Sequence, residues 1–425
     1  MAVEQSAVAG SARSQGGPGS KPWFRLPVRM LLTSTAFPPL TAGHAVVLDR
    51  MFRDLHPDDY RIVHFDDYMG QENLPSGWSS LPAPTFRYPS DWWQYLPDYP
   101  LSYVRRLRQF VGTVASTART LARICSAEQC RAIVVTTGTL PRLPAAALAA
   151  KLARVPLILL IWDFWRYLEF EPFHKWVAET LEPAVLRSAT AVVVPNEMLA
   201  ESIARLTGVR SVIIRLPIDD AALLGQEADP PPRQRSNGFS VVFTGQVYMS
   251  MTDPFNRLLA ALEEPGMENV TVHYHGRQAK ALLDAIGVKG RYVPHAFIPP
   301  PAIYDVQRDA DVLFLPLAFE GLHENLVYSS STTKLADYLA TGRPILVHAP
   351  PGAFPAWYVR RHRCGLVVDT PDPKALARAI ALLRQDEGLR LRLGRNALAR
   401  ARADFTIDEA RRRLAQLLVD VTRAA

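Results

Sequence analysis

Two successive series of short apolar runs, each run followed by a helical or loop segment, constrain this chain more than any other feature. The first series occupies residues 28–222 and the second residues 239–405. Short, continuously apolar runs that alternate with helices are typical of parallel sheets covered on both faces. The pattern predicts an α/β fold of two Rossmann-like, doubly wound domains that face each other across a cleft, where the carboxyl ends of the strands would hold a ligand.

The individual elements follow from the same pattern. Five strands are predicted in the first domain, at residues 29–34, 60–65, 132–137, 157–161 and 191–195, with helices near 45–55, 144–154, 174–188 and 197–208. Six strands are predicted in the second domain, at residues 240–245, 270–276, 292–295, 311–316, 344–347 and 366–368. A long insertion, 69–126, separates the second and third strands. It is first aromatic and proline-rich and then a predicted basic helix.

The remaining segments differ in composition from the two domains. Residues 1–27 begin with a stretch rich in Gly, Ser, Ala and Gln, which predicts a disordered tail and neither a signal peptide nor a membrane span. Prolines and small polar residues over 223–238 predict a linker. Residues 406–425 are predicted to form a final helix.

Charge and cysteine content narrow the function classes. Lys and Arg outnumber Asp and Glu by 48 to 41, for a net charge of +7, which favours anionic partners. Many arginines lie in the C-terminal helices, at 384–402 and 411–413, where we expect a solvated helix face, and Glu182 is likewise expected to be solvated. No nucleic-acid-binding signature accompanies them. Cys125, Cys130 and Cys364 lack metal-ligand spacing, so neither a zinc site nor a structural disulfide is expected.

The segment from Ser329 to Pro344 carries the most specific chemistry. Its hydroxyl run predicts a helix N-cap, Lys334 and Asp337 are neighbours at i and i+3, and Gly342 before Pro344 ends the helix ahead of an apolar strand. Free backbone N–H groups at a helix start attract phosphate, a lysine adds charge, and a carboxylate accepts hydrogen bonds from ribose hydroxyls. The alternative is an amphipathic surface helix with an ion pair.

This segment resembles the C-terminal half of GT-B fold glycosyltransferases of the family 4 type. There a Lys, two spacers, an acid and then Tyr-Leu-Ala-x-Gly-x-Pro recur, although the acid is usually Glu and here is Asp337. The resemblance spans residues 29–418 in element order. It implies a sugar-nucleotide-dependent glycosyltransferase that retains anomeric configuration, uses no metal or other cofactor, and has a final helix that crosses back to the first domain.

The resemblance also implies donor-binding residues. Gly245 ends the first strand of the donor domain at a glycine turn, with Gln246 beside it, and Arg277 is placed to pair with phosphate. The other implied donor contacts are His295 and Phe297 in the base-binding loop, Thr333 and Asp337 at the donor helix, and Gly43 in a glycine loop of the first domain. The alternative for the loop at Gly43 is a plain strand-to-helix turn.

Three residues are expected to act in catalysis. Lys334 would offset charge on the departing diphosphate, and Asp163, after the fourth strand, would orient an acceptor hydroxyl or else cap the next helix. The family's paired acids are not intact, because Ser329 stands at the position of the first. Either Glu320 or Glu324 then supplies the sugar-facing acid, and we assign this role to Glu320.

Several alternatives stay open. A sugar-nucleotide epimerase or hydrolase would share the donor pocket, a catalytically inactive relative would bind the donor only, and a two-domain ligand-binding protein would share the architecture. The expected partners are a nucleotide sugar and a glycan or lipid-linked acceptor, and the expected location is the cytoplasm. The basic insertion either contacts a membrane surface there or packs as a helical cap on the first domain.

Overall fold

The computed structural model describes residues 22–38, 43–65, 81–88, 103–167, 171–223, 238–299, 302–321 and 324–424. Most of the predicted tail and of the predicted linker lies outside the described residues, as do Trp92 and Trp93 of the insertion. The chain divides into two compact units. The first unit is Met1–Arg215 with Ala410–Ala425, and the second is Leu216–Glu409.

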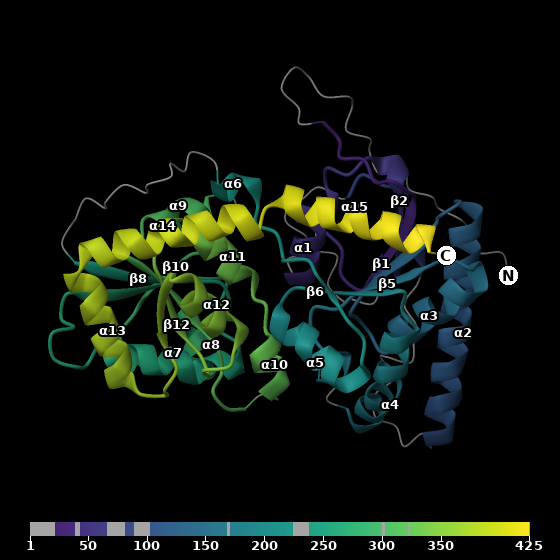
Figure 1. The fold of residues 1–425 in the computed structure, drawn as a ribbon. Helices are drawn as coiled ribbons and strands as arrows, with labels where there is room; N and C mark the ends of the chain where they lie inside the picture. The colour runs from purple at the N-terminus through teal and green to yellow at the C-terminus, as the bar shows by residue number, and fades with distance from the viewer. Residues whose placement is uncertain are drawn as a thin grey trace. The chain divides into compact units, whose positions relative to one another are not determined.

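A parallel sheet forms the centre of the first unit (Figure 1). Its described strands lie in the order β3-β2-β1-β4-β5-β6-β7. They are β1 (Met30–Ser34), β2 (Tyr60–Phe65), β3 (Thr85–Tyr88), β4 (Ala132–Thr136), β5 (Leu157–Leu160), β6 (Ala191–Val194) and β7 (Val212–Ile213). The five predicted strands are confirmed. The prediction missed β3, which lies inside the insertion, and β7, which has only two residues.

Helices cover this sheet because its strands are apolar on both sides. Every residue of β1, β2, β4 and β5 is buried. One core joins alternate strand residues, such as Leu31, Val63 and Val135, to the helices α2 to α5. The helices of this unit are α1 (Gly43–Phe52), α2 (Tyr103–Ala127), α3 (Arg142–Ala153), α4 (Pro172–Ser188) and α5 (Glu197–Thr207), with short 3-10 turns at Pro57–Asp59 and Trp165–Tyr167.

The second unit repeats this architecture. Its described strands form a parallel sheet in the order β10-β9-β8-β11-β12-β13. They are β8 (Phe239–Thr244), β9 (Val270–His275), β10 (Val293–His295), β11 (Val312–Pro316), β12 (Ile345–His348) and β13 (Gly365–Val368). All six predicted strands are confirmed. Numbered by their order in the chain within each unit, the strands of both sheets lie side by side in the order 3-2-1-4-5-6, and the first sheet adds a seventh strand. This is the strand order of the doubly wound Rossmann fold.

Helices also cover the second sheet. Phe243 of β8, Val272 of β9 and Phe314 of β11 share one core with Phe255 and Ile380 of two covering helices. The helices of this unit are α6 (Asp220–Leu223), α7 (Met249–Ala261), α8 (Lys280–Ala285), α9 (Ile303–Arg308), α10 (Glu324–Ser329), α11 (Thr333–Ala340), α12 (Phe354–His362), α13 (Pro373–Gln385) and α14 (Glu387–Asp404). Among the described residues, no helix of either unit has the length and apolar character needed to span a bilayer.

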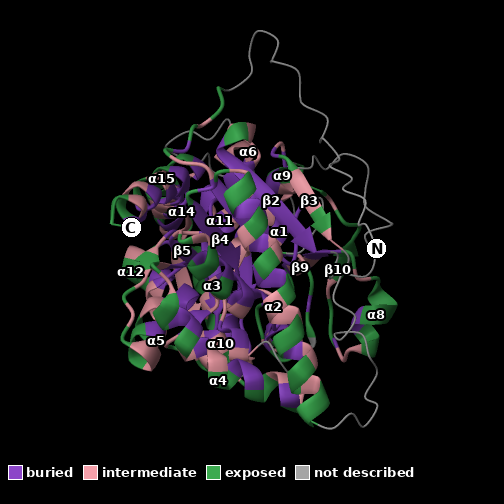
Figure 2. Ribbon diagram, turned by 90° about the vertical axis from the view of Figure 1, so that its right-hand side faces the viewer, coloured by how far each residue is buried: buried purple, intermediate pink, exposed green. Residues whose placement is uncertain are grey.

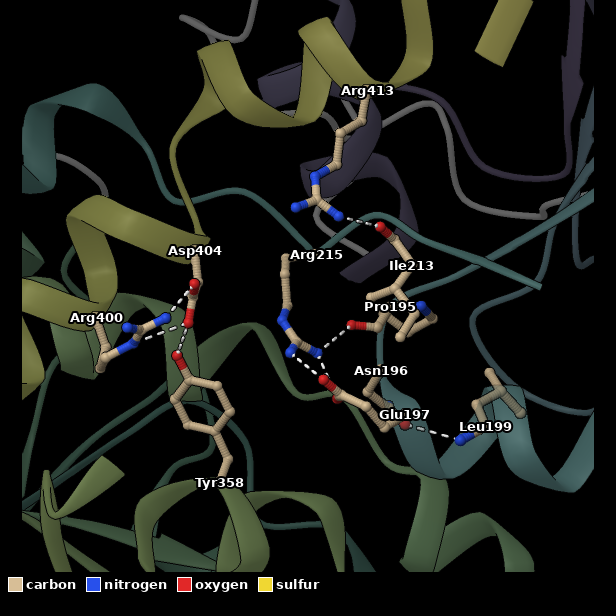
Figure 3. A network of polar contacts seen from close by, with 10 residues as sticks. All are labelled: Pro195, Asn196, Glu197, Leu199, Ile213, Arg215, Tyr358, Arg400, Asp404 and Arg413. Atoms are coloured by element: carbon tan, nitrogen blue, oxygen red, sulfur yellow. Dashed lines mark hydrogen bonds and ion pairs between the residues drawn. The ribbon is translucent and has the colours of Figure 1, made fainter. Parts of the chain in front are cut away.

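Arginines fix the ends of the first unit to its sheet (Figure 3). The Arg215 guanidinium donates to both Glu197 carboxylate oxygens, at 2.6 and 2.8 Å, and to the Pro195 carbonyl at 3.1 Å. Arg413, on the final helix α15 (Ile407–Arg423), donates to the Ile213 carbonyl at 3.0 Å. These contacts hold the last strands of the sheet and the final helix within one unit.

A matching set of contacts lies at the end of the second unit (Figure 3). The Tyr358 hydroxyl donates to the Asp404 carboxylate, and Arg400 Nε donates to the same carboxylate at 3.0 Å. The Ile218 amide donates to the Phe405 carbonyl at 2.8 Å. The two segments at which the chain enters and leaves this unit are therefore joined to each other and anchored on α12.

Arg411 contradicts the expectation that the C-terminal arginines are solvated. It is only 2% exposed. Its guanidinium donates to the carbonyls of Met51, at 2.8 Å, and Arg50, at 3.1 Å, and pairs with Asp54 at 3.2 Å. Carbonyls at a helix C-terminus lack partners within the helix and attract a cation. Arg411 therefore caps the end of α1.

Candidate functional site

The strand order places the candidate donor site at one edge of the second sheet. In doubly wound sheets, ligands bind beyond the carboxyl ends of the strands, where the strand order reverses. That reversal falls between β8 and β11, which are paired neighbours. Gly245 follows β8, Glu320 follows β11 by a short loop, and Lys334 lies in the first turn of α11. The predicted donor and catalytic residues of this domain therefore belong to elements that end at this edge.

Lys334 and Gly245 are in direct contact. A methyl group on Gly245 would lie 2.7 Å from Lys334 Cε and 3.1 Å from Nζ, and Gly245 has a φ of +112°. The Gly245 amide donates to the His275 carbonyl at 2.8 Å, which fixes the turn. Because Gly245 has no side chain, the lysine side chain has room above this turn. Burial lowers the pKa of Lys334, while the Asp337 carboxylate opposes that shift. The site therefore presents a partly desolvated cation.

Helix α11 is held against β8 by one tyrosine. Thr332 caps the helix by accepting from the Lys334 amide at 3.3 Å, which confirms the predicted N-cap, and Thr333 is the first helical residue. The Tyr338 hydroxyl accepts from the Thr244 amide at 3.0 Å and lies 3.2 Å from the Thr244 hydroxyl. Burial raises the pKa of Tyr338 to about 12. This contact fixes Lys334, one turn earlier, over the end of β8.

A second side chain fixes the loop after Gly245. Gln278 Oε1 accepts from the Val247 amide at 2.7 Å, and Gln278 Nε2 donates to the Val247 carbonyl at 2.9 Å. The Tyr274 hydroxyl donates to the same Gln278 oxygen at 3.1 Å. Gln246, a predicted donor-binding residue, is exposed in the loop that the Gln278 side chain holds. Sequence reasoning missed Tyr338 and Gln278 because each acts through a distant backbone segment.

Three histidines lie at the neighbouring strand ends. The ring of His295 stacks on that of His275 with centroids 4.3 Å apart and planes within 4° of parallel. His295 Nε2 lies 2.9 Å from His273 Nδ1. Burial, followed by the two other histidines, lowers the pKa of His275 to about 4, so this ring is neutral at physiological pH. His295 is exposed, so one ring of the stack faces the surface at the predicted base-binding loop.

Phe297, the other predicted residue of that loop, contacts Arg277, the predicted phosphate partner that follows β9. The Arg277 guanidinium carbon lies 4.2 Å from the centroid of the Phe297 ring. Both side chains are exposed, and Phe297 lies just beyond β10. A guanidinium over an aromatic face is a favourable cation–π arrangement. The structure thus brings a phosphate-binding candidate and a base-binding candidate into contact.

The loop after β11 presents the two candidate acids. Glu320 is exposed in the loop, and Glu324 is exposed at the start of α10, while Leu322 and His323 lie outside the described residues. The preceding Phe319 packs against His348, with ring centroids 4.6 Å apart, and against Arg257, whose guanidinium carbon is 5.0 Å from the Phe319 centroid. The loop is therefore anchored immediately before Glu320.

The first unit has its own reversal of strand order, between β1 and β4, and the predicted Asp163 lies one strand further along. Asp163 is partly buried after β5, and burial raises its pKa to about 7. Trp162 precedes Asp163 in the chain, and its ring packs against that of His44, with centroids 4.7 Å apart. Burial lowers the pKa of His44 to about 4. A neutral imidazole, an indole and a desolvated carboxyl group thus occupy neighbouring positions at this edge.

Gly43 and Thr137 border the same edge. Gly43 is the first residue of α1, and a methyl group there would meet no described atom within 4 Å. The Thr137 hydroxyl accepts from the Trp162 amide at 3.3 Å and donates to the Asp163 carbonyl at 3.4 Å. Thr137 therefore fixes the backbone at Asp163, while packing among the described residues does not require a glycine at position 43. His44, adjacent to Gly43, is the residue that sequence reasoning left out.

Glu182 contradicts the expectation that it is solvated. It is 2% exposed and accepts from the Trp165 amide at 2.6 Å and from the Arg166 guanidinium. Burial raises the pKa of Glu182, and the Arg166 charge opposes the rise. A buried carboxylate needs such partners. Glu182 therefore holds the turn that follows Asp163.

The described residues contain no group of three or more His, Cys, Asp or Glu side chains arranged to hold a metal ion. Lys334 supplies a cation at the reversal of strand order in the second unit. This arrangement can hold a diphosphate next to a fixed charge and a helix N-terminus.

Two sequence families match the chain, one in each unit. Residues 42–218 match the glycosyl transferase 4-like domain, and residues 238–386 match the glycosyl transferases group 1 domain. No curated protein matches the chain by sequence.

Solved structures with the GT-B fold match nearly the whole chain. HepE of Anabaena in complex with UDP is 17% identical, with a TM-score of 0.60, and the match covers 92% of this chain and 100% of that one. Sucrose-phosphate synthase of Thermosynechococcus elongatus is 16% identical, with a TM-score of 0.63 and coverage of 93% and 100%. Trehalose 6-phosphate synthase of Burkholderia multivorans is 14% identical, with a TM-score of 0.63 and coverage of 93% and 99%.

Proposed function

This chain is a glycosyltransferase, built from a glycosyl transferase 4-like domain and a glycosyl transferases group 1 domain, and on that premise we propose that it transfers a sugar from a nucleoside diphosphate to an acceptor hydroxyl. The bond between the anomeric carbon and the diphosphate oxygen breaks, and a bond to the acceptor oxygen forms. The acceptor's proton goes to the departing diphosphate. The anomeric configuration is retained, and no metal ion is needed.

The contact between Lys334 and Gly245 carries this proposal. It sets a cation at the reversal of strand order in the second unit, beside the N-terminus of α11. Negative charge grows on the diphosphate as it leaves, and a fixed cation in a partly desolvated site stabilises that charge more than water does. Lys334 thus supplies the charge that a metal ion provides in other enzymes.

One of the structural relatives supports the proposal that the donor is a nucleotide sugar. The Anabaena HepE structures contain UDP, UDP with glucose, or UDP-glucose. In this chain the Arg277 and Phe297 pair and the exposed face of His295 would contact the base and a phosphate. Asp337 would accept from the ribose hydroxyls. Gln246 and Thr333 would donate from the loop and the helix start.

The acceptor is assigned to the first unit. Asp163 has a pKa of about 7, so near neutral pH its carboxyl group changes between accepting and donating a hydrogen bond. It would orient the acceptor hydroxyl, and Gly43 would leave the start of α1 open to the donor diphosphate. The acceptor class is a glycan or a lipid-linked sugar. The proposed location is the cytoplasm, with peripheral contact to a membrane.

Transfer is tested by incubating the protein with sugar nucleotides and a panel of soluble and lipid-linked acceptors, and identifying products by mass spectrometry. Acceptor-dependent loss of nucleoside diphosphate with a glycosylated product supports the proposal. Release of free sugar without acceptor would indicate a hydrolase, a changed sugar would indicate an epimerase, and donor binding without turnover would indicate an inactive relative. NMR of the product gives the anomeric configuration, and added EDTA tests the need for a metal.

A further inference from the structure

Helix α2 has an unusual charge composition for a surface helix. Its 25 residues, Tyr103–Ala127, contain arginines at 105, 106, 108, 119 and 123 and no Asp or Glu. Surface helices of globular proteins commonly mix both signs of charge, which gives favourable pairs at i and i+4. A cationic helix with no acid of its own favours an anionic partner.

The first half of α2 also exposes a stripe of large apolar side chains. Tyr103, Val104, Leu107 and Val111 are 66%, 68%, 42% and 56% exposed. Residues 104, 107 and 111 follow the i, i+3 and i+7 spacing of one helix face. The second half of the helix buries its apolar side chains, including Leu121, in the core of the first unit. The stripe therefore extends beyond the part of the helix that the core uses.

A second helix adds an aromatic residue to this stripe. Tyr103 contacts Phe173, near the start of α4, with ring centroids 5.9 Å apart. One turn further along the chain from Phe173, Trp176 is 51% exposed and its neighbour Lys175 is also exposed. Figure 2 shows exposed residues along both α2 and α4. Tyr and Trp are the residues enriched where a protein meets the polar boundary of a bilayer.

Not every arginine in the first half of α2 is available to bind an external anion. Arg106 donates to Glu171 at 2.8 Å and is used within the unit. Arg105 and Arg108 are exposed and lie on the flank of the apolar stripe. Glu179, also exposed, is the nearest acid on the outer side of α4 in sequence. Arg105, Arg108 and Lys175 thus border the apolar residues, and the described acids nearby are Glu179, which is exposed, and Glu171, which pairs with Arg106.

We propose that these residues form a docking surface for an anionic lipid bilayer. The α2–α4 surface consists of the apolar residues Tyr103, Val104, Leu107, Val111 and Trp176 and the cations Arg105, Arg108 and Lys175. The apolar side chains enter the headgroup region, and the cations, with long aliphatic stems, reach anionic headgroups beside them. A bilayer satisfies both halves of this surface, whereas an acidic protein partner matches only the charges. The surface shares no residue with the donor site, and the proposal does not depend on sugar transfer.

The test is co-sedimentation of the purified full chain with vesicles in the absence of any sugar nucleotide. One set of vesicles contains phosphatidylcholine with phosphatidylglycerol, and the other contains phosphatidylcholine alone. Arg105→Glu with Arg108→Glu tests the charges, and Leu107→Ser with Val111→Ser tests the apolar stripe. Matched controls are Arg131→Glu with Arg210→Glu, and Leu282→Ser with Leu382→Ser, which change exposed residues elsewhere on the protein.

Wild type and both controls are expected to bind the anionic vesicles and to bind the neutral vesicles weakly. Each basic residue near an anionic surface contributes about 1 kcal/mol, so reversing two lowers the partition coefficient by at least about tenfold. The apolar variant loses a similar factor. Equal binding of the test and control variants, or no binding of wild type to anionic vesicles, would overturn the proposal. Unchanged thermal unfolding of each variant excludes misfolding as the cause of weaker vesicle binding. Nucleotide binding is measured separately, so that a failure of membrane docking is distinguished from a failure of the proposed sugar transfer.

Discussion

Replacing Gly245 by alanine is expected to disable the donor site through one methyl group. The new Cβ would lie 2.7 Å from Lys334 Cε, so the lysine side chain must leave its position over the end of β8. Loss of one positioned donor that stabilises developing charge costs a factor of about 10² to 10³ in kcat. Weaker phosphate binding adds about tenfold or more in nucleotide affinity, because a charge-assisted hydrogen bond contributes about 1.5–3 kcal/mol.

Backbone strain must be separated from this effect. Gly245 has a φ of +112°, and a side chain in such a conformation costs about 1–3 kcal/mol whatever its surroundings. Gly266→Ala is the matched control, because Gly266 lies in the same unit with a φ of +86° and nothing lies within 4 Å of its added methyl group. Each kcal/mol lowers Tm by about 2–4 °C in a domain of this size. Both variants are therefore expected to melt a few degrees below wild type.

The assay is kcat/KM for sugar transfer together with calorimetric titration of the nucleotide, on wild type and both variants. We expect a drop of about 100-fold or more in kcat/KM for Gly245→Ala and near-normal values for Gly266→Ala. If Gly245→Ala keeps its turnover, or if both variants lose activity equally, the contact with Lys334 does not matter to the site.

Three further predictions concern carboxylates. Glu320→Gln should abolish transfer while Glu324→Gln keeps wild-type activity, and the reverse result would move the sugar-facing role to Glu324. Burial raises the pKa of Asp163 from 3.8 to about 7, so between these pH values the folded protein holds a proton that the unfolded chain has released. The stability of wild type should therefore fall as pH rises from about 4 to about 7. Denaturant titrations should show no such fall for Asp163→Asn, and the same pH dependence in both proteins would refute this role of Asp163. Glu182→Ala should lower the free energy of unfolding by about 3–5 kcal/mol, because it leaves the partly buried Arg166 charge and the Trp165 amide without their acceptor. A loss below about 1 kcal/mol in urea titration would contradict a stabilising pair.

The two sheets were predictable because each central strand is buried on both faces and is therefore continuously apolar in sequence. The strand Val312–Pro316 and its partner Ile345–His348 are examples, with every residue buried. The strand Thr85–Tyr88 lies at the sheet edge and is only partly buried, so it lacks that pattern. The two-residue strand at Val212 is too short to carry any periodic signal.

The site was predictable only where the chemistry is local. Lys334 and its capping residues are neighbours in sequence, so the helix start could be recognised. The hydrogen bond from Thr244 to Tyr338 joins positions 94 residues apart, and no spacing rule links them. Burial of Glu182 likewise depends on Arg166 and the turn around it, which the helical pattern of α4 does not reveal.

The most direct test of the donor site is calorimetric titration and thermal shift with UDP, GDP, ADP and TDP and a few of their sugars, on wild type and Lys334→Ala. We expect selective binding of one nucleotide by wild type and its loss in the variant, with the fold of the variant intact. Binding that is unchanged in Lys334→Ala, or no binding of any nucleotide by wild type, would contradict the central claim.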